Sequence, residues 1–379
     1  MNAAMDFRFS DEQTTIRELA RGILEKEVTP ERLKAAEATP DRIDDALWRT
    51  LADANLLGVA VPEAQGGMGL GLLELCTLCE EVGRAVAPVP VVASLVQGGL
   101  AITRFGSDAQ RERWLRPLAS GDAILALALD DAGSDDVAAP ATRARREGEG
   151  WVLDGAKRLV AAAGRAARVV VPAATDAGVA LFLVDPNGAG VARTAQRTST
   201  GEPLFDLALA GVRVGKGDVL PGGGADALRW LHDASIAALC ATQVGVSERA
   251  LEITTGYVRE RIQFGVPIGS FQSVQHRAAD SWIDLQAMRW TMWRAAVRIV
   301  EGQDVERETA VAKFWAADGG SRIANAAQHL HGGMGVDVDY PIHRFFLWSK
   351  ALELSLGGAT PQLARLGRAL AQSQPLELA

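Results

Sequence analysis

Apolar residues in the first third of the chain recur at helical spacing. The first such segment follows Ser10 and Gln13, which have the spacing of a capping box, a pattern that marks the start of a helix. Its apolar positions lie three or four residues apart: Ile16, Leu19, Ile23 and Leu24. Two more amphipathic segments follow at residues 43–57 and 72–82. The pattern predicts a helical N-terminal domain over residues 1–122.

The hydrophobic pattern changes in the middle of the chain. Short runs rich in Val, Leu and Ala stand between clusters of Gly, Asp, Pro and Asn, at residues 123–129, 151–153, 168–171, 179–184 and 204–214. In the last run Phe205, Leu207 and Leu209 alternate with other residues, as in a half-buried strand. Several short strands without helices between them are typical of an antiparallel β-sandwich or β-barrel. We therefore predict a middle β domain over residues 123–220.

A Pro- and Gly-rich stretch, residues 221–224, precedes a return to helical spacing. Residues 228–260 are compatible with one long helix, and residues 281–300 with a second. In the second segment one side is formed by Trp282, Leu285, Met288 and Met292. We predict a C-terminal helical domain over residues 225–379 and, for the whole chain, the α+β class with helical, β and helical domains.

Composition and charge exclude several kinds of partner. The chain has 39 Lys and Arg against 47 Asp and Glu, and no stretch gathers basic residues, so nucleic acid is not an expected partner. The longest apolar runs, such as residues 123–129, fall short of the roughly 18 residues that a membrane-spanning helix needs. Asp6 and Arg8 stand where a signal peptide would be apolar, and three cysteines are too few for a disulfide framework. The sequence predicts a cytoplasmic protein.

Cysteine and histidine residues are the possible metal ligands of this chain. Cys76 and Cys79 have CxxC spacing, but no second pair of ligands lies nearby, so we expect the two thiols to pack in an apolar core. His329, His331 and His343 come without the carboxylates of a known metal signature. We interpret them as internally bonded or interface histidines, and we predict no metal site. GxGxxG, P-loop and GxSxG patterns do not occur.

Two C-terminal segments place polar, aromatic and glycine residues close together. Residues 259–272 form a helix end that breaks on Gly and Pro and exposes cations, an aromatic ring and an amide. Residues 328–344 contain Gly332 and Gly333, whose lack of a Cβ would let the backbone come close to an anionic ligand. The alternative for this second segment is an ordinary helix C-cap followed by a turn.

These segments resemble motifs of the acyl-CoA dehydrogenase family. The family's R-x-x-F-G…F-Q pattern is matched by Arg261, Phe264, Gly265, Phe271 and Gln272. Its G-G-x-G…Y-P…R pattern is matched by Gly332, Gly333, Gly335, Tyr340, Pro341 and Arg344. Residues 61–69 are similar to a loop of the family's N-terminal domain. The resemblance covers essentially the whole chain and implies a helical domain, a β-barrel-like domain and a C-terminal four-helix bundle. It also implies FAD as the cofactor and α,β-dehydrogenation of an acyl-CoA thioester.

The chain departs from the family at the proton acceptor. Dehydrogenation needs a carboxylate that removes the proton beside the thioester carbonyl. The resemblance implies that Leu356 and Ser235 occupy the two places where family members carry this Glu, and that Ile236 replaces an arginine that supports acyl-CoA binding. Residues 157–161 match a K-x-W-I-T stretch whose Trp and Thr lie against the flavin, but they contain neither residue. The catalytic residue is therefore unknown.

The opposite half of the family's site is retained. The resemblance implies that the residues reaching FAD held mainly by a neighbouring subunit are Arg261, Phe264, Gln272, Gln328, Gly332 and Gly333. Arg261 is expected to pair with the pyrophosphate, and Phe264 and Gln272 to hold the adenosine end. His329 is an alternative to Gln328 at its position.

This division resembles the catalytically incomplete subunits of heterotetrameric acyl-CoA dehydrogenases of bacterial steroid and side-chain catabolism, in which two family chains share each FAD. It implies a bulky or branched acyl-CoA substrate, a second family subunit as partner, and an electron-transfer flavoprotein or similar acceptor. One alternative is an active homomeric enzyme with Glu353 as a displaced base, on the expected helical face of Leu356. Another is a non-enzymatic role or an oxygen-using oxidation on the same fold.

Overall fold

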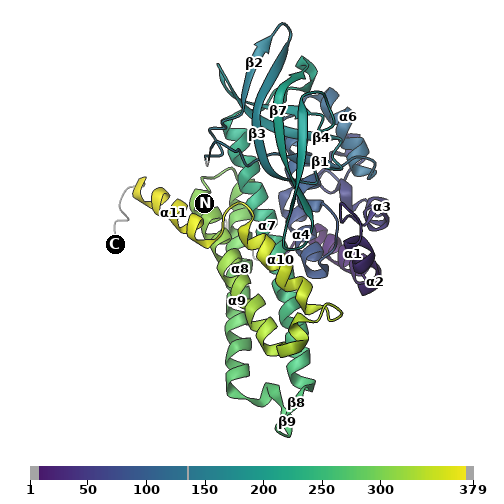
Figure 1. Ribbon diagram of the computed structural model, residues 1–379, viewed down its shortest axis with the longest axis vertical. Helices are drawn as coiled ribbons and strands as arrows, with labels where there is room; N and C mark the ends of the chain where they lie inside the picture. Colours follow the sequence, from purple (N-terminus) through teal and green to yellow (C-terminus); the bar gives the residue numbers. More distant parts are fainter. Residues whose placement is uncertain (1–7, 135, 373–379) are drawn as a thin grey trace.

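The computed structural model describes residues 8–134 and 136–372, so Asp6 and the outer ends of the two predicted terminal domains lie outside the described residues. Along the chain, short helices come first, a sheet second and long helices last (Figure 1). This order confirms the predicted α+β architecture. The limits given for the three domains stay a prediction.

Short helices form the N-terminal part. They are α1 (Asp11–Glu27), α2 (Pro30–Glu37), α3 (Asp45–Asp53), α4 (Leu72–Ala85), α5 (Leu100–Phe105) and α6 (Asp108–Ala119), with the π-helical turn η3 (Val92–Gly99) before α5. The predicted capping box is confirmed, because the Ser10 hydroxyl accepts from the Gln13 backbone N–H at 3.2 Å and the Gln13 side chain accepts from the Ser10 N–H at 3.1 Å. Of the four apolar positions expected on the inner face of α1, Leu19 is exposed and the others pack inward.

A mixed sheet forms the middle part. Its strands are β1 (Leu125–Leu127), β2 (Arg143–Glu147), β3 (Gly150–Ala161), β4 (Arg168–Thr175), β5 (Gly178–Val184), β6 (Val191–Arg197) and β7 (Pro203–Val214). They are ordered β1-β4-β2-β3-β7-β6, and β5 pairs with β4. The predicted antiparallel pairing holds for most neighbours, but β1 and β4 run parallel, as β2 and β4 do where they meet. The hydrophobic pattern does not predict β2 and β6, because their side chains are mostly exposed and polar or small.

Long helices form the C-terminal part. They are α7 (Ala225–Glu260), α8 (Gln272–Val300), α9 (Glu306–His331), α10 (Ile342–Leu354) and α11 (Ala359–Gln372). The helices expected at residues 228–260 and 281–300 are confirmed, although α8 already begins at Gln272. Helices α7 to α10 pack against one another as the bundle, and α11 lies against α9. A hairpin of β8 (Ile262–Gln263) and β9 (Val266–Pro267) stands at the end of the bundle farthest from the sheet (Figure 1).

Helices α4 and α7 cross in backbone contact and so join the N-terminal part to the bundle. A Cβ placed on Gly245 would lie 1.8 Å from the Glu80 carbonyl oxygen, and one on Gly83 would lie 2.0 Å from the Thr242 carbonyl oxygen. Only glycine fits at such distances, because any other residue would force the two backbones apart. The crossing therefore fixes how the two helical parts sit against each other.

The three cysteines lie beside this crossing. Cys76 and Cys79 come from α4 and Cys240 from α7, and all three are free and buried in the main core. The predicted apolar packing of the CxxC pair is confirmed. Burial raises the pKa of the Cys79 and Cys240 thiols to about 12, so both stay protonated and unreactive at neutral pH.

Candidate functional site

The first motif segment forms an exposed turn at the far end of the bundle. Arg261 caps the C-terminus of α7, and the chain then turns through Phe264 and Gly265 between β8 and β9. Both turn residues have positive φ, 54° and 81°, which a two-residue hairpin turn of this kind requires. The turn leaves Phe264 93% exposed.

Arg261 and Gln272 flank this turn from the ends of two helices. Gln272 is the first residue of α8, and both side chains are exposed. Neither forms a side-chain hydrogen bond or ion pair with another residue of the described ranges. The Phe264 ring lies edge to face against Phe271, with centroids 6.3 Å apart. The hairpin and its flanks thus leave a cation, an aromatic ring and an amide exposed at the surface.

The second motif segment borders a cavity of about 790 Å³ between α8, α9 and α10. Gln328, His329 and Gly332 line it, together with Arg277 of α8. A Cβ on Gly332 or Gly333 would meet nothing within 4 Å, so the space in front of these glycines is open. A side chain would therefore have room at both positions. At Gly332 the backbone still favours glycine, because its φ is positive, 57°. Open space before a glycine turn suits a ligand that approaches the backbone closely.

One residue that lines this cavity has a buried polar atom without a partner. The side-chain oxygen of Gln328 is buried and accepts no hydrogen bond within the described part of the chain. An unpaired buried acceptor costs free energy until a donor from water or a ligand meets it. The structure brings Gln328, His329 and Gly332 together here, but Arg261, Phe264, Gln272 and Gly333 do not line this cavity. Sequence reasoning missed Arg277, whose signal is its place on α8 shortly after Gln272.

Of the two positions that the resemblance assigns to the proton acceptor, one is fully buried and the other is partly buried against the main core. Ser235 is fully buried, and its hydroxyl donates to the Leu231 carbonyl oxygen at 2.6 Å. Leu356 follows α10 with a positive φ of 53°, packs against the main core, and its carbonyl oxygen accepts from the Gln362 amide at 2.9 Å. Ile236 is also buried. None of these side chains offers a carboxylate.

Glu353 does not share a helical face with Leu356, so that expectation is wrong. Helix α10 ends at Leu354, and Leu356 lies beyond its last turn in a left-handed conformation. The Glu353 carboxylate accepts instead from Lys350 Nζ at 2.5 Å, one turn back on the same helix. Its geometry is that of a helix ion pair.

A buried cluster around Asp233 stands near these positions and was not predicted. The Asp233 carboxylate accepts from Arg365 Nη2 at 3.1 Å and from the Thr309 hydroxyl at 3.3 Å. Burial opposes its ionisation, but His232 and Arg365 hold the pKa of Asp233 below its usual value. A carboxylate with a lowered pKa and two donors is a poor proton acceptor. The cluster ties α7, α9 and α11 together.

Lys313 is a second buried charge that was not predicted. Its ammonium group donates to the carbonyl oxygens of Leu352 and Glu353, both at 3.0 Å, at the end of α10. These carbonyls have no partner inside their helix, so a cation there satisfies them and suits the helix dipole. Burial lowers the pKa of Lys313 to about 8. The sequence signal that could have found it is a single lysine in the otherwise apolar run of residues 310–317.

The stretch that the resemblance places against the flavin is a bulge in β3. Lys157 points inward and forms a buried ion pair with Asp131 at 2.7 Å. The pairing with β7 slips between Lys157 and Val160, and Leu159 has a positive φ of 52°. Its backbone N–H donates to Asp206 at 3.0 Å while its side chain is half exposed. An aliphatic side chain therefore stands where the resemblance places an aromatic ring.

The histidines of the second segment have partners of other kinds. His331 Nδ1 lies 2.8 Å from the Ala327 carbonyl oxygen, and its ring stacks on Tyr257. His343 Nδ1 lies 2.6 Å from the Tyr340 carbonyl oxygen. Across residues 8–134 and 136–372, no three His, Cys, Asp or Glu side chains gather as a metal site would need. In the same ranges no helix has the length and apolar character to cross a membrane.

Sequence models of a single family match nearly the whole chain. The acyl-CoA dehydrogenase N-terminal domain matches residues 10–122, the middle domain residues 125–208 and the C-terminal domain residues 222–371. The three matches follow the order of the helical, β and helical parts of the fold.

Individual proteins and solved structures of the same family are also similar to this chain. "Acyl-CoA dehydrogenase FadE27" of Mycobacterium tuberculosis is 40% identical over 97% of this chain and 100% of that protein. The ChsE4-ChsE5 complex from Mycobacterium tuberculosis contains a chain with a TM-score of 0.92 and 39% identity, covering 98% of this chain and 100% of that one. A structure described as the Tcur3481-Tcur3483 steroid ACAD has a TM-score of 0.89 and 44% identity, covering 95% and 98%. The chain therefore belongs to the acyl-CoA dehydrogenase family, whose members depend on FAD.

Proposed function

We propose that this chain is the catalytically incomplete subunit of a heteromeric acyl-CoA dehydrogenase and completes the FAD site of a second family chain. The assembled enzyme would oxidise a bulky or branched acyl-CoA between its α and β carbons. Electrons would pass to an electron-transfer flavoprotein or a similar acceptor. The observation that carries the proposal is a contrast. The two base positions hold Ser235 and Leu356, which carry no carboxylate, whereas the side chains of Arg261 and Gln272 have no hydrogen bond or ion pair within the described residues.

The packed positions support the first half of the proposal. Leu356 and Ser235 hold no carboxylate, Glu353 is paired with Lys350, and Asp233 is held ionised by its neighbours. None of these four positions therefore presents a group that could take a proton from a carbon beside a thioester. The partner subunit would supply that group.

The exposed residues support the second half. FAD, when bound, accepts the hydride that leaves the β carbon. The Arg261 guanidinium would bind a pyrophosphate oxygen by charge-assisted hydrogen bonds, and Phe264 would cover the adenine ring. The open space before Gly332 and Gly333 fits the nucleotide end of this cofactor. The bulge at Leu159 offers no aromatic ring for the isoalloxazine end, so this chain would not hold a complete FAD alone.

The relatives support the kind of assembly and substrate. One similar structure is a complex of two named chains, and another is described as a steroid ACAD, which favours a bulky acyl group. We also propose a cytoplasmic location, supported by three thiols that remain free.

The proposal is tested by purifying the full chain alone and together with a second family chain that carries Glu at one of the two base positions. Flavin absorbance against protein concentration gives the FAD content, and bleaching of the flavin by acyl-CoA gives the activity. We expect the chain alone to be nearly colourless and inactive, and the pair to bind FAD and bleach with a bulky acyl-CoA.

A chain that is stably yellow alone and bleaches rapidly with any acyl-CoA would contradict the proposal and favour the homomeric alternative. Fast reoxidation of the reduced pair by oxygen, without an electron carrier, would favour the oxidase alternative. Each outcome is read from the same flavin spectrum.

A further inference from the structure

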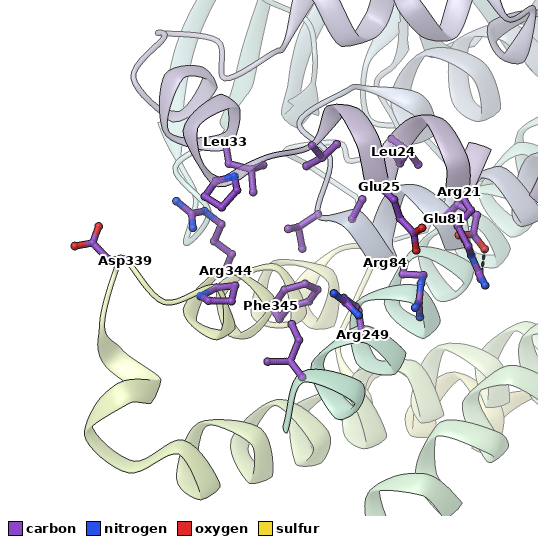
Figure 2. Close-up of a pocket in the computed structure, with 16 residues that line it drawn as sticks. Arg21, Leu24, Glu25, Leu33, Glu81, Arg84, Arg249, Asp339, Arg344 and Phe345 are labelled. Atoms are coloured by element: carbon purple, nitrogen blue, oxygen red, sulfur yellow. Dashed lines mark hydrogen bonds and ion pairs between the residues drawn. The ribbon is translucent and has the colours of Figure 1, made fainter. Parts of the chain in front are cut away.

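A second cavity lies between the N-terminal helices and the bundle. It encloses about 440 Å³ and is lined by α1, α2 and α4 on one side and by α7 and α10 on the other (Figure 2). It shares no lining residue with the cavity beside Gln328 and contains none of the residues expected to bind FAD. Cavities of this size between domains are common places for small ligands.

Apolar side chains form a large part of the lining of this cavity, called the seam cavity below. They include Leu24, Val28, Leu33, Val86, Ile253 and Phe345, of which Leu33 and Ile253 pack against the cluster that contains Val86 and Phe345. These residues come from both sides of the seam, so a ligand would contact the N-terminal helices and the bundle at once. Burial of an apolar ligand body against them would be favourable in proportion to the area removed from water.

Guanidinium groups lie beside this apolar lining. Figure 2 shows Arg344 on one side of Phe345, with Arg249 and Arg84 on the other. Arg249 uses only Nη1, which donates to Glu252 at 3.0 Å, and its other N–H groups have no partner within the described residues. Free N–H groups of a guanidinium are well placed to bind a carboxylate by two parallel hydrogen bonds.

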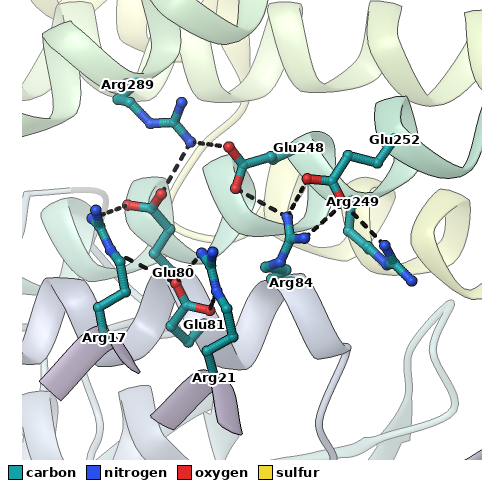
Figure 3. Close-up of polar contacts among 9 residues, drawn as sticks. All are labelled: Arg17, Arg21, Glu80, Glu81, Arg84, Glu248, Arg249, Glu252 and Arg289. Carbon is teal, nitrogen blue, oxygen red and sulfur yellow. Dashed lines mark hydrogen bonds and ion pairs between the residues drawn. The ribbon is translucent and has the colours of Figure 1, made fainter. Parts of the chain in front are cut away.

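The carboxylates that pair with these arginines lie behind them rather than in the cavity. Glu248 and Glu252 bind Arg84, and Arg289 extends the network from α8 (Figure 3). Neither glutamate lines the cavity, and the same is true of Glu37, which holds Arg344 with two hydrogen bonds. The wall therefore presents the positive ends of these ion pairs.

Carboxylates that do line the cavity are mostly neutralised. Glu81 accepts two hydrogen bonds from Arg21, and Asp339 pairs with Lys34 at 2.6 Å on the outer surface. Glu25 is an exposed exception at the edge. The apolar lining with cations beside it is therefore suited to a molecule that is itself apolar with one negative end.

We propose that the seam cavity binds a small amphipathic carboxylate, with its carboxylate on Arg249 and its apolar body against Ile253 and Phe345. This site is separate from the proposed FAD site and does not depend on it. Because the walls come from both helical parts, the ligand would also stabilise their contact.

The test uses the full chain and decanoate as the probe, titrated by calorimetry at low salt. We expect one saturable decanoate site per chain, and at least about tenfold weaker binding of the neutral decan-1-ol, because the charged contact is lost. Arg249→Met should weaken decanoate about tenfold or more for the same reason. Arg229→Met is the matched control, because Arg229 lies on the same helix, is exposed and forms one ion pair, with Asp226. It should leave the affinity unchanged.

A second variant keeps the test decisive if Arg249→Met does not fold. Ile253→Trp enlarges a side chain of the apolar lining while keeping every arginine, and it should abolish decanoate binding with the thermal unfolding of the chain preserved. The proposal is overturned by absence of saturable binding, by equal binding of decan-1-ol, or by equal effects of Arg249→Met and Arg229→Met. The FAD content of the assembled pair should be the same in all variants, so a failure here leaves the proposed function standing.

Discussion

The two ends of α7 carry functional positions of opposite character. Near its start, Asp233 and Ser235 are buried, and each has hydrogen-bond partners inside the chain. At its end, Arg261 and the following Phe264 are exposed, and the Arg261 side chain has no hydrogen bond or ion pair within the described residues. One helix thus connects a region completed by its own chain to a region left open.

The two ends of α7 therefore differ in what their polar side chains do. Those near its start stabilise the fold, and those at its end are available to bind another molecule. Most polar groups that remain buried after folding find partners within the chain, as Asp233 does. Exposed side chains pay no such penalty, so Arg261 and Phe264 are free to serve another molecule. Substitutions should therefore have large effects on stability in the packed region and almost none at the hairpin.

The largest effect is expected at the crossing of α4 and α7. Gly245→Ala would place a methyl group 1.8 Å from the Glu80 carbonyl oxygen, so the helices must separate. We expect a loss of about 3 kcal/mol or more in the free energy of unfolding, measured by chemical denaturation of the full chain.

Gly256→Ala is the control on the same helix, closer to the hairpin. A Cβ there meets nothing within 4 Å, and alanine is the better helix former by up to about 1 kcal/mol. This variant should be as stable as the wild type or more stable. Equal destabilisation by both substitutions would show that the packed and open regions of α7 do not differ.

Lys313→Met tests how much the buried ammonium group of Lys313 contributes to the stability of the packed region. The variant leaves the carbonyls of Leu352 and Glu353 without their buried donor, which should cost about 2 kcal/mol of unfolding free energy. The effect should also depend on pH. Because the pKa of Lys313 falls from 10.5 to about 8 on folding, unfolding takes up a proton between these values. The wild type should therefore gain stability relative to Lys313→Met as the pH rises through this window, and a constant difference would contradict the shift.

Arg365→Met should have a smaller effect at the start of α7. It removes one donor from the Asp233 carboxylate, while the Thr309 hydroxyl and His232 remain close. We expect a loss of about 1–2 kcal/mol. Combining it with Asp233→Asn should give less than the sum of the two single losses, because both variants break the same contact. Strict additivity would show that the pair is not coupled.

Much of the fold could be predicted from local pattern. The capping box of α1 and the long helices of the bundle follow from spacing alone. Strands β2 and β6 could not be found in this way, because exposed polar or small residues carry no alternation. The parallel pairing of β1 with β4 is likewise invisible to local pattern, since it depends on which distant strands meet.

Some residues of the candidate site could also be predicted from the sequence, and others could not. The motif residues Arg261 and Phe264 could be singled out from the sequence, and the structure leaves them exposed. The contact between Asp233 and Arg365 could not, because 132 residues separate them along the chain. The expectation for Glu353 is wrong because the sequence does not reveal that α10 stops at Leu354.

The smallest effect on stability is expected at the hairpin, where the effect on function should be greatest. Arg261→Met removes a guanidinium that has no partner within the described residues, so the unfolding free energy should change by less than about 0.5 kcal/mol. In the assembled pair, loss of its contact with a pyrophosphate should lower the affinity for FAD about tenfold or more. Arg259→Met is the control for charge alone, because Arg259 is an exposed arginine two residues earlier, and this variant should retain FAD.

Two outcomes would contradict this prediction. If both variants bind FAD like the wild type, the open end of α7 does not serve a partner's cofactor. If Arg261→Met unfolds the chain, that end is not open, because stability would then depend on a side chain that forms no hydrogen bond or ion pair within the described residues.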